Sequence, residues 1–470
     1  MISIFPKNIA NDAVRLYLGA LATVSIVFFS HSMSLLYIAL GVMWVCAFFL
    51  LSNKFTQEWQ RLTPKQYMLK ILYIGLPIRI AWVIFSYFYF QAKTGVPFEF
   101  DAADSMGYHG DSEWLANSPW EMTVWYLFTS GMKGISDAGY PLYLSLLYRI
   151  TGSSIFIARI VKCFISMGTC LLIYNIGRRN FGEKVGRMAG IFAMLMPNLI
   201  IYCGLHLKET EMIFLTLLFL DRADNLIHAK EYHVWTIAIP ILLVIPLFFF
   251  RTVLGAVAAF SMLTAFVFTT DRVMGKAKKA MMIAWAAAAI AVLGGGTIQS
   301  EIEGVWEDRG ENQTVKRDQQ TARGNKWAKY ATGGVMAPMA LFLPYPTMVD
   351  VDEQYNQQIM HGGNYVRNYL GIFVLIAIFS AIFIKKNWRD FVLIGAFTVG
   401  YLLIISMSGF ANAERFLLPG LPGLLIMAAY GVSLLNAKNY RFVRYWYVVV
   451  VLMAVGWAFF KLGSRGIVGV

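Results

Sequence analysis

The chain is short of charge and of cysteine, and each shortage excludes a class of protein. Only 14% of its 470 residues are charged, which excludes a soluble globular or intrinsically disordered chain. Its four cysteines lie in or beside apolar runs without metal-type spacing, so we expect no zinc site and no structural disulfide. It also lacks a Walker loop, a dinucleotide fingerprint and a nucleophile elbow, so we expect no use of ATP or of a nucleotide sugar.

Apolar and aromatic residues are abundant instead. They make up 58% of the chain, the mean hydropathy is +0.57, and 35 Phe, 24 Tyr and 13 Trp are present. This composition is typical of a polytopic α-helical membrane protein. The net charge of +13 comes from short loops between apolar runs rather than from one patch, so we expect no nucleic-acid partner.

The apolar runs predict the transmembrane helices, since a span needs about 20 residues. The fold class we predict is an all-α polytopic membrane protein with about 13 transmembrane helices (11–14). The runs at 188–205 and 209–226 could instead be re-entrant segments that do not cross the membrane. The first run lacks a cleavage site and is expected to stay as a span. The thirteen runs lie near 13–30, 33–51, 69–90, 153–176, 188–205, 209–226, 234–250, 252–270, 280–296, 366–384, 391–408, 416–435 and 445–461.

Basic residues indicate the orientation of these runs. With a cytoplasmic N-terminus, the inside connections hold twenty Lys and Arg. The loops 91–138, with seven acidic and two basic residues, and 297–365, with nine and six, then face outside. We therefore predict a multi-pass integral protein of a bacterial inner membrane with its site on the outer face. The inside connections are 52–70, 177–187, 221–233, 271–279, 385–390 and 436–444.

Four regions follow from this topology: an N-terminal helix pair (1–66), a core (67–296) that includes the acidic loop 91–138, a large outer loop (297–365) and C-terminal helices (366–470). The stretch 139–150 is too short to span, so it is an interfacial helix or an extension of the next span.

The acidic loop carries the first candidate site. Asp101, Asp104, His109, Asp111 and Glu113 lie within 13 residues, and such a group can hold a general base or a divalent cation. Asp104, Asp101 and Asp111 are the candidate catalytic residues, and Asp104 with Asp111 would be the ligands if Mg²⁺ or Mn²⁺ were bound. The alternative is a solvated loop whose acids only enforce topology. Tyr108 and Trp114 are expected to anchor a helix on the membrane surface.

Basic residues at the outer helix ends form the second candidate group, because the positive-inside rule disfavours them there. An anionic lipid headgroup or phosphate would explain them, and so would a snorkelling pair or an intramolecular partner such as Glu414 or a loop carboxylate. Three more cations within spans, Arg79, Arg159 and Lys162, could pair with buried acids or line a cavity, and His361 could reach the same site. The candidates for binding substrate or lipid phosphate are Tyr108, His109, Lys208, Glu209, Arg251, Arg367 and Arg415.

Three stretches share their order with a known family. They are FDAADSMGYHGDSEWLA (100–116), the segment 139–200 with its Arg-Arg-x-Phe-Gly turn and later proline, and ERFLLPGLPGLLIMAAYG (414–431). In this order the chain resembles the GT-C superfamily of membrane glycosyltransferases, above all the protein mannosyltransferase and aminoarabinose transferase branch. The likeness touches about a third of the chain, residues 97–215 and 405–431.

The resemblance implies transfer of a sugar from a polyprenyl-phosphate carrier to a glycan, lipid or protein acceptor at the outer membrane face. It also implies an acid in the first loop as general base or metal ligand, which matches Asp104 best. The chain departs from the family where paired acids are usually adjacent, because Ser105 follows Asp104, and this leaves Asp101 and Asp111 open. A polymerase or ligase using lipid-linked oligosaccharides is the alternative in the same class, and a transporter or flippase of lipid-linked sugars is the alternative outside it.

Overall fold

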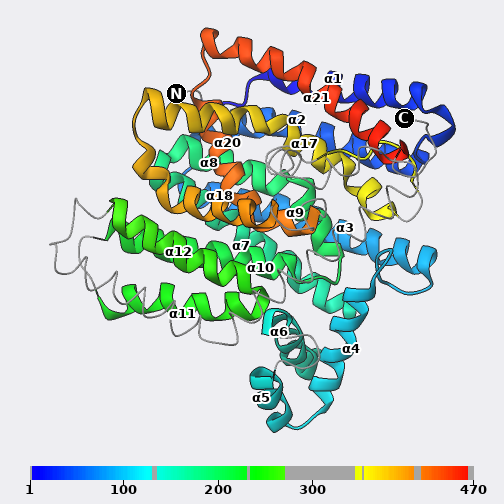
Figure 1. Ribbon diagram of the computed structural model, residues 1–470, viewed down its shortest axis with the longest axis vertical. Coiled ribbons are helices and arrows are strands. Elements are labelled where there is room, and N and C mark those ends of the chain that lie inside the picture. The colour runs from blue at the N-terminus through cyan, green and yellow to red at the C-terminus, as the bar shows by residue number, and fades with distance from the viewer. Residues whose placement is uncertain are drawn as a thin grey trace.

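A computed structural model describes residues 3–129, 135–229, 233–269, 345–351, 354–406 and 414–463, and these residues form helices and no strand (Figure 1). The long helices lie side by side, and α4, α5 and α6 are grouped at the lower edge of the view. The α-helices are α1 (Lys7–Val27), α2 (Leu35–Glu58), α3 (Pro64–Thr94), α4 (Ala103–Asn117), α5 (Trp120–Thr129), α6 (Ile135–Thr151), α7 (Ile155–Phe181), α8 (Glu183–Leu195), α9 (Pro197–Ile201), α10 (Glu209–His228), α11 (Val234–Phe250), α12 (Thr252–Thr269), α17 (Tyr355–Phe379), α18 (Val392–Ser406), α19 (Glu414–Leu417), α20 (Leu421–Ser433) and α21 (Ala437–Gly463).

Seven helical segments of the described chain are long and apolar enough to cross a membrane. An eighth results if α8 and α9, which are bent by 51° at their junction, count as one span. The predicted all-α polytopic membrane fold is therefore confirmed, but the number thirteen is not. The seven segments are Leu35–Arg61, Pro64–Thr94, Ile155–Phe181, Tyr355–Ile384, Trp388–Ser406, Glu414–Ser433 and Lys438–Gly463.

The predicted runs 13–30, in α1, and 209–226, in α10, are not among the seven segments, and a further part of the shortfall lies in the middle of the chain and has a physical reason. α11 has 17 residues, which at about 1.5 Å per residue reach about 26 Å, less than the roughly 30 Å hydrocarbon core. α12 is similarly short and apolar. The predicted run 280–296, and most of the predicted loop 297–365, lie outside the described residues.

The acidic segment between α3 and α7 is helical, as expected for outer loops with helices of their own. α4 and α5 pack against α6, and α6 packs against α11. α6 is distinct from α7, because the chain turns at Gly152, whose φ of 69° suits a residue without a side chain. The stretch 139–150 is therefore a helix in its own right rather than an extension of the next span.

Arg79 of α3 stabilises the break between α8 and α9. Pro197 begins α9, and the preceding carbonyls cannot complete the α-helical pattern. The guanidinium of Arg79 donates to the carbonyl oxygens of Met194 (3.1 Å) and Ala193 (3.3 Å), and also to Ser166 Oγ (2.8 Å). Arg79 thus has neither of the expected partners, a buried acid or a cavity. It pairs with backbone groups left open by the break.

Arg159 and Lys162, two buried basic residues in the first half of α7, act in a similar way. Lys162 donates to the carbonyl oxygens of Leu205 (2.8 Å) and Leu207, and its Nζ lies 3.6 Å from Glu211 Oε2. Arg159 donates to the carbonyl of Pro97 at 2.5 Å. Together they hold the segment that leads into α10 and the loop that leads into α4, so they position the region that contains both candidate groups.

Close packing of α17 against α20 gives a stability prediction. A Cβ at Gly431 would lie 1.9 Å from the carbonyl oxygen of Phe373, whereas one at Gly456 of α21 would meet nothing within 4 Å. Gly431→Ala should therefore destabilise the protein by about 1–3 kcal/mol through overpacking. Thermal unfolding in detergent, followed by size-exclusion chromatography, would measure the loss. Gly456→Ala is the matched control, and equal melting temperatures for the two variants would contradict the packing.

Candidate functional site

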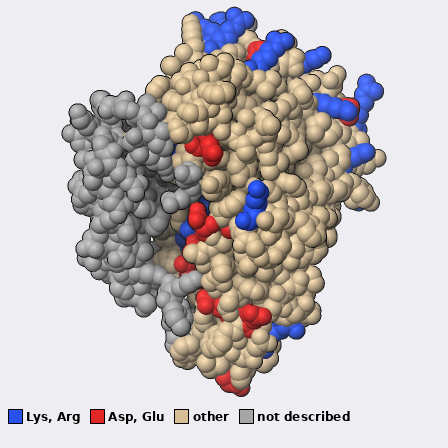
Figure 2. Space-filling view, turned by 90° about the vertical axis from the view of Figure 1, so that its right-hand side faces the viewer, with Lys and Arg blue, Asp and Glu red and all other residues tan. Residues whose placement is uncertain are grey.

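Six charged side chains from distant parts of the chain, all in or at the ends of helices, meet beside the first turn of α4. Figure 2 shows one face of the molecule, with Asp and Glu gathered down its middle and Lys and Arg mainly towards its upper and right edges. Three of the six are acids and three are bases, so the group is neutral as a whole. We call it the charged cluster, and it consists of Asp104, Asp137, Lys208, Glu209, Arg251 and Arg415.

The pair formed by Asp104 and Arg415 is its most accessible part. Arg415 Nη1 lies 2.5 Å from Asp104 Oδ2, and the two side chains are 33% and 46% exposed. The acid opens α4, and the base lies in α19, more than 300 residues later. The sequence left Glu414 or a loop carboxylate as partners of Arg415, and the loop carboxylate is the one in contact.

Arg251 is the inner neighbour of this pair. Its Nη1 donates to Tyr401 Oη at 2.9 Å, and its Nη2 lies 4.0 Å from Glu209 Oε1. The guanidinium carbons of Arg251 and Arg415 lie 4.4 Å and 4.8 Å from the centroid of the Phe416 ring. Both arginines therefore make a cation–π contact with the same ring.

Lys208 is held by protein groups on all sides. Its ammonium contacts Asp137 Oδ1 and donates to the carbonyls of Ser136 (3.2 Å) and Phe250 (2.6 Å). Tyr108 donates its hydroxyl to Asp137 Oδ1 at 3.0 Å. Burial tends to raise the pKa of the Asp137 carboxyl, but Lys208 and Tyr108 outweigh it, so that pKa lies below its usual range. Lys208 and Tyr108 therefore shape the wall of the cluster, and phosphate would have to displace Asp137 to reach them.

The other residues of α4 diverge from this pair. Asp111 lies beside Tyr126 of α5, two turns from Asp104. His109 faces α6, where its Nδ1 lies 2.9 Å from Tyr148 Oη. Asp101 precedes the helix, is exposed, and has a left-handed φ of 54°. The structure thus brings Asp104 and Tyr108 to the cluster and leaves Asp101, His109 and Asp111 outside it.

The donors do not fit a Mg²⁺ or Mn²⁺ ion. Asp104 and Asp111 are seven residues apart, about 10 Å along the helix, and each has a different neighbour. Arg415 already neutralises Asp104. Within the described residues no group of three or more His, Cys, Asp or Glu could hold a metal ion. Asp104 and Asp111 therefore do not form the predicted pair of metal ligands.

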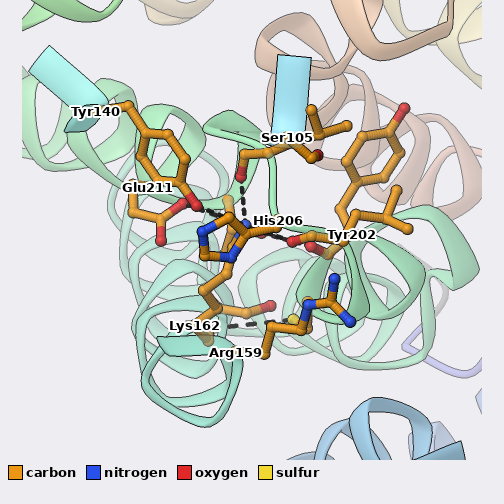
Figure 3. A network of polar contacts seen from close by, with 12 residues as sticks. Ser105, Tyr140, Arg159, Lys162, Tyr202, His206 and Glu211 are labelled. Atoms are coloured by element: carbon orange, nitrogen blue, oxygen red, sulfur yellow. Dashed lines mark hydrogen bonds and ion pairs between the residues drawn. The ribbon is translucent and has the colours of Figure 1, made fainter. Parts of the chain in front are cut away.

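His206 lies in a buried network with Tyr140, Arg159 and Lys162 (Figure 3). Tyr148 Oη lies 2.9 Å from His109 Nδ1 and 3.1 Å from His206 Nε2. Burial, with Arg159 and Lys162 nearby, holds the pKa of His206 well below its usual range. His206 is therefore neutral, and it serves as an internal contact rather than as a phosphate ligand.

Arg367 lies deeper, on α17. It is buried, its Nη1 lies 3.8 Å from Glu414 Oε1, and none of its nitrogens has a hydrogen-bond partner. Asn364 donates to Glu414 Oε2 at 2.9 Å. His361 is elsewhere: it bonds Tyr17 Oη at 2.7 Å, between α17 and α1, and has a packing role.

Several cluster residues were missed by reasoning from the sequence. Asp137 was counted only as one of seven acids, although it is the partner of Lys208. Tyr401 and Phe416 orient the arginines but lie within apolar runs, where nothing marks them out. The one available signal was that Asp137 stands at the boundary between the acidic loop and an apolar helix, where an exposed charge has little reason to be.

The pair of buried Lys208 and partly exposed Asp137 gives a second prediction. Asp137→Ala should destabilise the protein by roughly 3–5 kcal/mol, because it leaves an ammonium buried without its counter-charge. Adding Lys208→Met should restore part of that loss. A double-mutant cycle of unfolding free energies would measure the coupling, with exposed Glu113→Ala as a near-neutral control.

The pH dependence follows from the lowered pKa of Asp137. The pair's contribution is present above the usual carboxyl pKa and is lost as pH falls through the lower folded value, below about pH 4. The wild type should therefore lose its advantage over Asp137→Ala only in strong acid. Strictly additive effects of the two substitutions, or an advantage unchanged by acid, would contradict the pairing.

Comparisons with known proteins add no family to this description. No protein-family model matches the chain, and a search of curated proteins finds no match. The likeness to GT-C enzymes therefore stays a prediction, and the function must be argued from the residues of the site.

Proposed function

We propose that the protein is a membrane glycosyltransferase that moves a sugar from a polyprenyl-phosphate donor to a glycan, lipid or protein acceptor at the outer membrane face. The observation that carries this proposal is the accessible contact between Asp104 and Arg415. It combines a carboxylate that can take a proton with a guanidinium that can hold a phosphate, at one end of a bundle of long apolar helices.

Donor binding would separate this pair. A phosphodiester, like a carboxylate, offers Arg415 two oxygens in the geometry that suits a guanidinium, so it can replace Asp104 as the partner. The partial exposure of both side chains leaves room for this exchange. Once Arg415 binds phosphate, Asp104 is free to accept a proton. Binding of the donor thus prepares the base.

Transfer would then be a direct displacement. The acceptor hydroxyl oxygen forms a bond to the anomeric carbon while Asp104 takes the hydroxyl proton. The bond from the anomeric carbon to the phosphate oxygen breaks, and its electron pair stays on the polyprenyl phosphate. Arg415 stabilises that growing negative charge, together with Arg251, which contacts the same Phe416 ring. The configuration at the anomeric carbon is inverted.

A polymerase or ligase that uses lipid-linked oligosaccharides is the second candidate. Arg367 favours it, because this buried guanidinium has no hydrogen-bond partner and lies near Tyr202, as does Arg415. A third cation would suit a diphosphate carrier. Reconstituted protein offered a single-sugar monophosphate donor and a lipid diphosphate oligosaccharide in turn would distinguish the two. A transporter is less well supported, since Arg79 and Lys162 bind backbone carbonyls rather than line a path.

Asp104→Asn tests the role of the base. The change removes the proton acceptor and the charge that competes for Arg415, so kcat should fall roughly 100- to 10,000-fold while the donor KM stays equal or falls. Release of polyprenyl phosphate from a panel of polyprenyl-phosphate sugars in proteoliposomes would measure both constants.

Two controls complete this test. Glu113→Gln removes an exposed carboxylate from the same helix and should leave both constants unchanged. Native mass spectrometry with added undecaprenyl phosphate should show that Asp104→Asn still binds the lipid and that Arg415→Gln binds it at least 10-fold less. Full turnover by Asp104→Asn would remove the assignment of the base, and no turnover of any lipid-linked sugar by the wild type would overturn the function.

A further inference from the structure

An open hollow lies beside the first turn of α4, apart from the charged cluster. Its volume is about 630 Å³, within the range of small-molecule sites, which is about 300–1,000 Å³. None of the cluster residues borders it. The end of α3, the loop into α4, the start of α4 and the first residue of α17 form its walls. The lining residues are Thr94, Val96, Glu99, Phe100, Asp101, Ala102, Met106 and Tyr355.

The walls of the hollow are fixed by contacts between distant parts of the chain. The rings of Phe100 and Tyr355 are 5.0 Å apart, and Phe100 also packs edge-on against Phe90 at 5.9 Å. Asn356 of α17 donates to the carbonyl of Phe100 at 2.5 Å, and Arg159 of α7 does the same at Pro97. The loop is therefore held in shape before any ligand arrives, which lowers the entropic cost of binding.

Two carboxylates border this aromatic wall. Glu99 is only 5% exposed; Ser105 donates to its Oε1, while its Oε2 is buried without a hydrogen-bond partner. The nearby charge of Arg159 offsets the cost of burying this carboxylate, so Glu99 is a fixed part of the wall. Asp101 is exposed and held at a φ of 54°, a conformation that a residue with a side chain adopts at a cost. Strain of this kind is common at binding sites.

Aromatic rings beside carboxylates match the chemistry of a sugar. The C–H face of a pyranose packs on an aromatic ring, and its hydroxyls donate to carboxylate oxygens. The hollow is mostly apolar, with only a few polar groups, as ligand sites are. A phosphate would be repelled by Glu99 and Asp101, and so would any other anion. A neutral, hydroxyl-rich ligand with one apolar face fits these walls.

We propose that this hollow binds a saccharide, and that it is the subsite for the acceptor sugar. Phe100 and Tyr355 carry the ring face, and Asp101 and Glu99 accept hydrogen bonds from hydroxyls. The assignment as acceptor rests on the proposed function, in which Asp104 is the base. Asp104 stands one residue before Ser105, which holds Glu99, so the loop that binds the sugar also places the carboxylate that takes its proton.

Direct binding of sugars tests the site without any enzyme assay. Saturation-transfer NMR on the full-length protein in nanodiscs would use methyl glycosides of glucose, galactose, mannose and N-acetylglucosamine at millimolar concentration. At least one should receive saturation in its ring C–H protons, and Tyr355→Ala and Asp101→Asn should each weaken that signal at least fivefold. Trp114→Ala and Glu113→Gln are the matched controls, an exposed aromatic and an exposed acid of α4 outside the hollow.

Each outcome decides the matter. Signal lost in the two hollow variants and kept in the two controls supports the site. No signal from any glycoside in the wild type, or equal signal in all variants, overturns it. Melting temperatures near that of the wild type would show that the hollow variants are folded, and Met106→Ala, a milder change in the lining, should reduce the signal as well.

A kinetic experiment separates this proposal from the proposed function. In proteoliposomes, Tyr355→Ala should raise the acceptor KM at least 10-fold while slow release of polyprenyl phosphate to water, without acceptor, stays unchanged. An unchanged acceptor KM would overturn the acceptor assignment and leave the function standing. If no lipid-linked sugar is cleaved by the wild type, the function fails, and the NMR result still decides whether sugars bind.

Discussion

The structure around the charged cluster depends on one requirement: buried backbone carbonyls that have no partner within a helix must receive hydrogen bonds from other parts of the chain. The chain breaks between α8 and α9 and turns between residues 202 and 208, in surroundings where water is scarce. Each unpaired carbonyl there would cost several kcal/mol in hydrocarbon, so donors must come from elsewhere. Arg79 of α3 and Lys162 of α7 supply them, and Lys208 of the turn donates to the carbonyls of Ser136 and Phe250 in neighbouring segments. Buried cations are rare in membrane proteins and can mark a transport path. Here they donate the hydrogen bonds that the buried backbone carbonyls need.

The same contacts determine which charges remain available. Lys162 fixes the segment that opens α10, and this places Lys208 on Asp137 and Glu209 towards Arg251. Lys208 is thereby committed to the fold. The pair of Asp104 and Arg415 does not hold backbone carbonyls in this way, and it is more exposed than Lys208. A ligand can therefore exchange with this pair at little cost to the fold, which is why the chemistry is assigned there.

Sequence reasoning succeeded where a local pattern determines the structure. Apolar length located the helices, and the acidic loop was correctly expected to contain helical segments. The structure joins Asp104 of the first candidate site to Arg415 of the second group, as charges at the ends of apolar runs can meet at the same level of a bundle. The number of spans was not confirmed, since α11 is apolar throughout yet too short.

What could not be predicted depends on contacts across hundreds of residues. Nothing local indicates that Tyr401 would orient Arg251, that Glu414 would take Arg367 rather than its neighbour Arg415, or that Asp104 and Asp111 would have separate partners. In the linear sequence, Asp104 and Asp111 are close enough to suggest one shared metal site. In a helix the rise of about 10 Å separates them.

The position of the hollow relative to the arginines is also consistent with a displacement reaction. Tyr355 borders the hollow at the start of α17, and Arg367 lies twelve residues later, about 18 Å deeper along the helix. An acceptor entering at the end of the bundle and a lipid phosphate approaching from the apolar side would thus reach Asp104 from different directions. In-line attack requires opposite directions of approach, because the nucleophile and the leaving group must lie on opposite sides of the anomeric carbon. In the proposed reaction, Asp104 in the first turn of α4 is the group that contacts Arg415 before the donor binds and would then accept the proton of the acceptor hydroxyl.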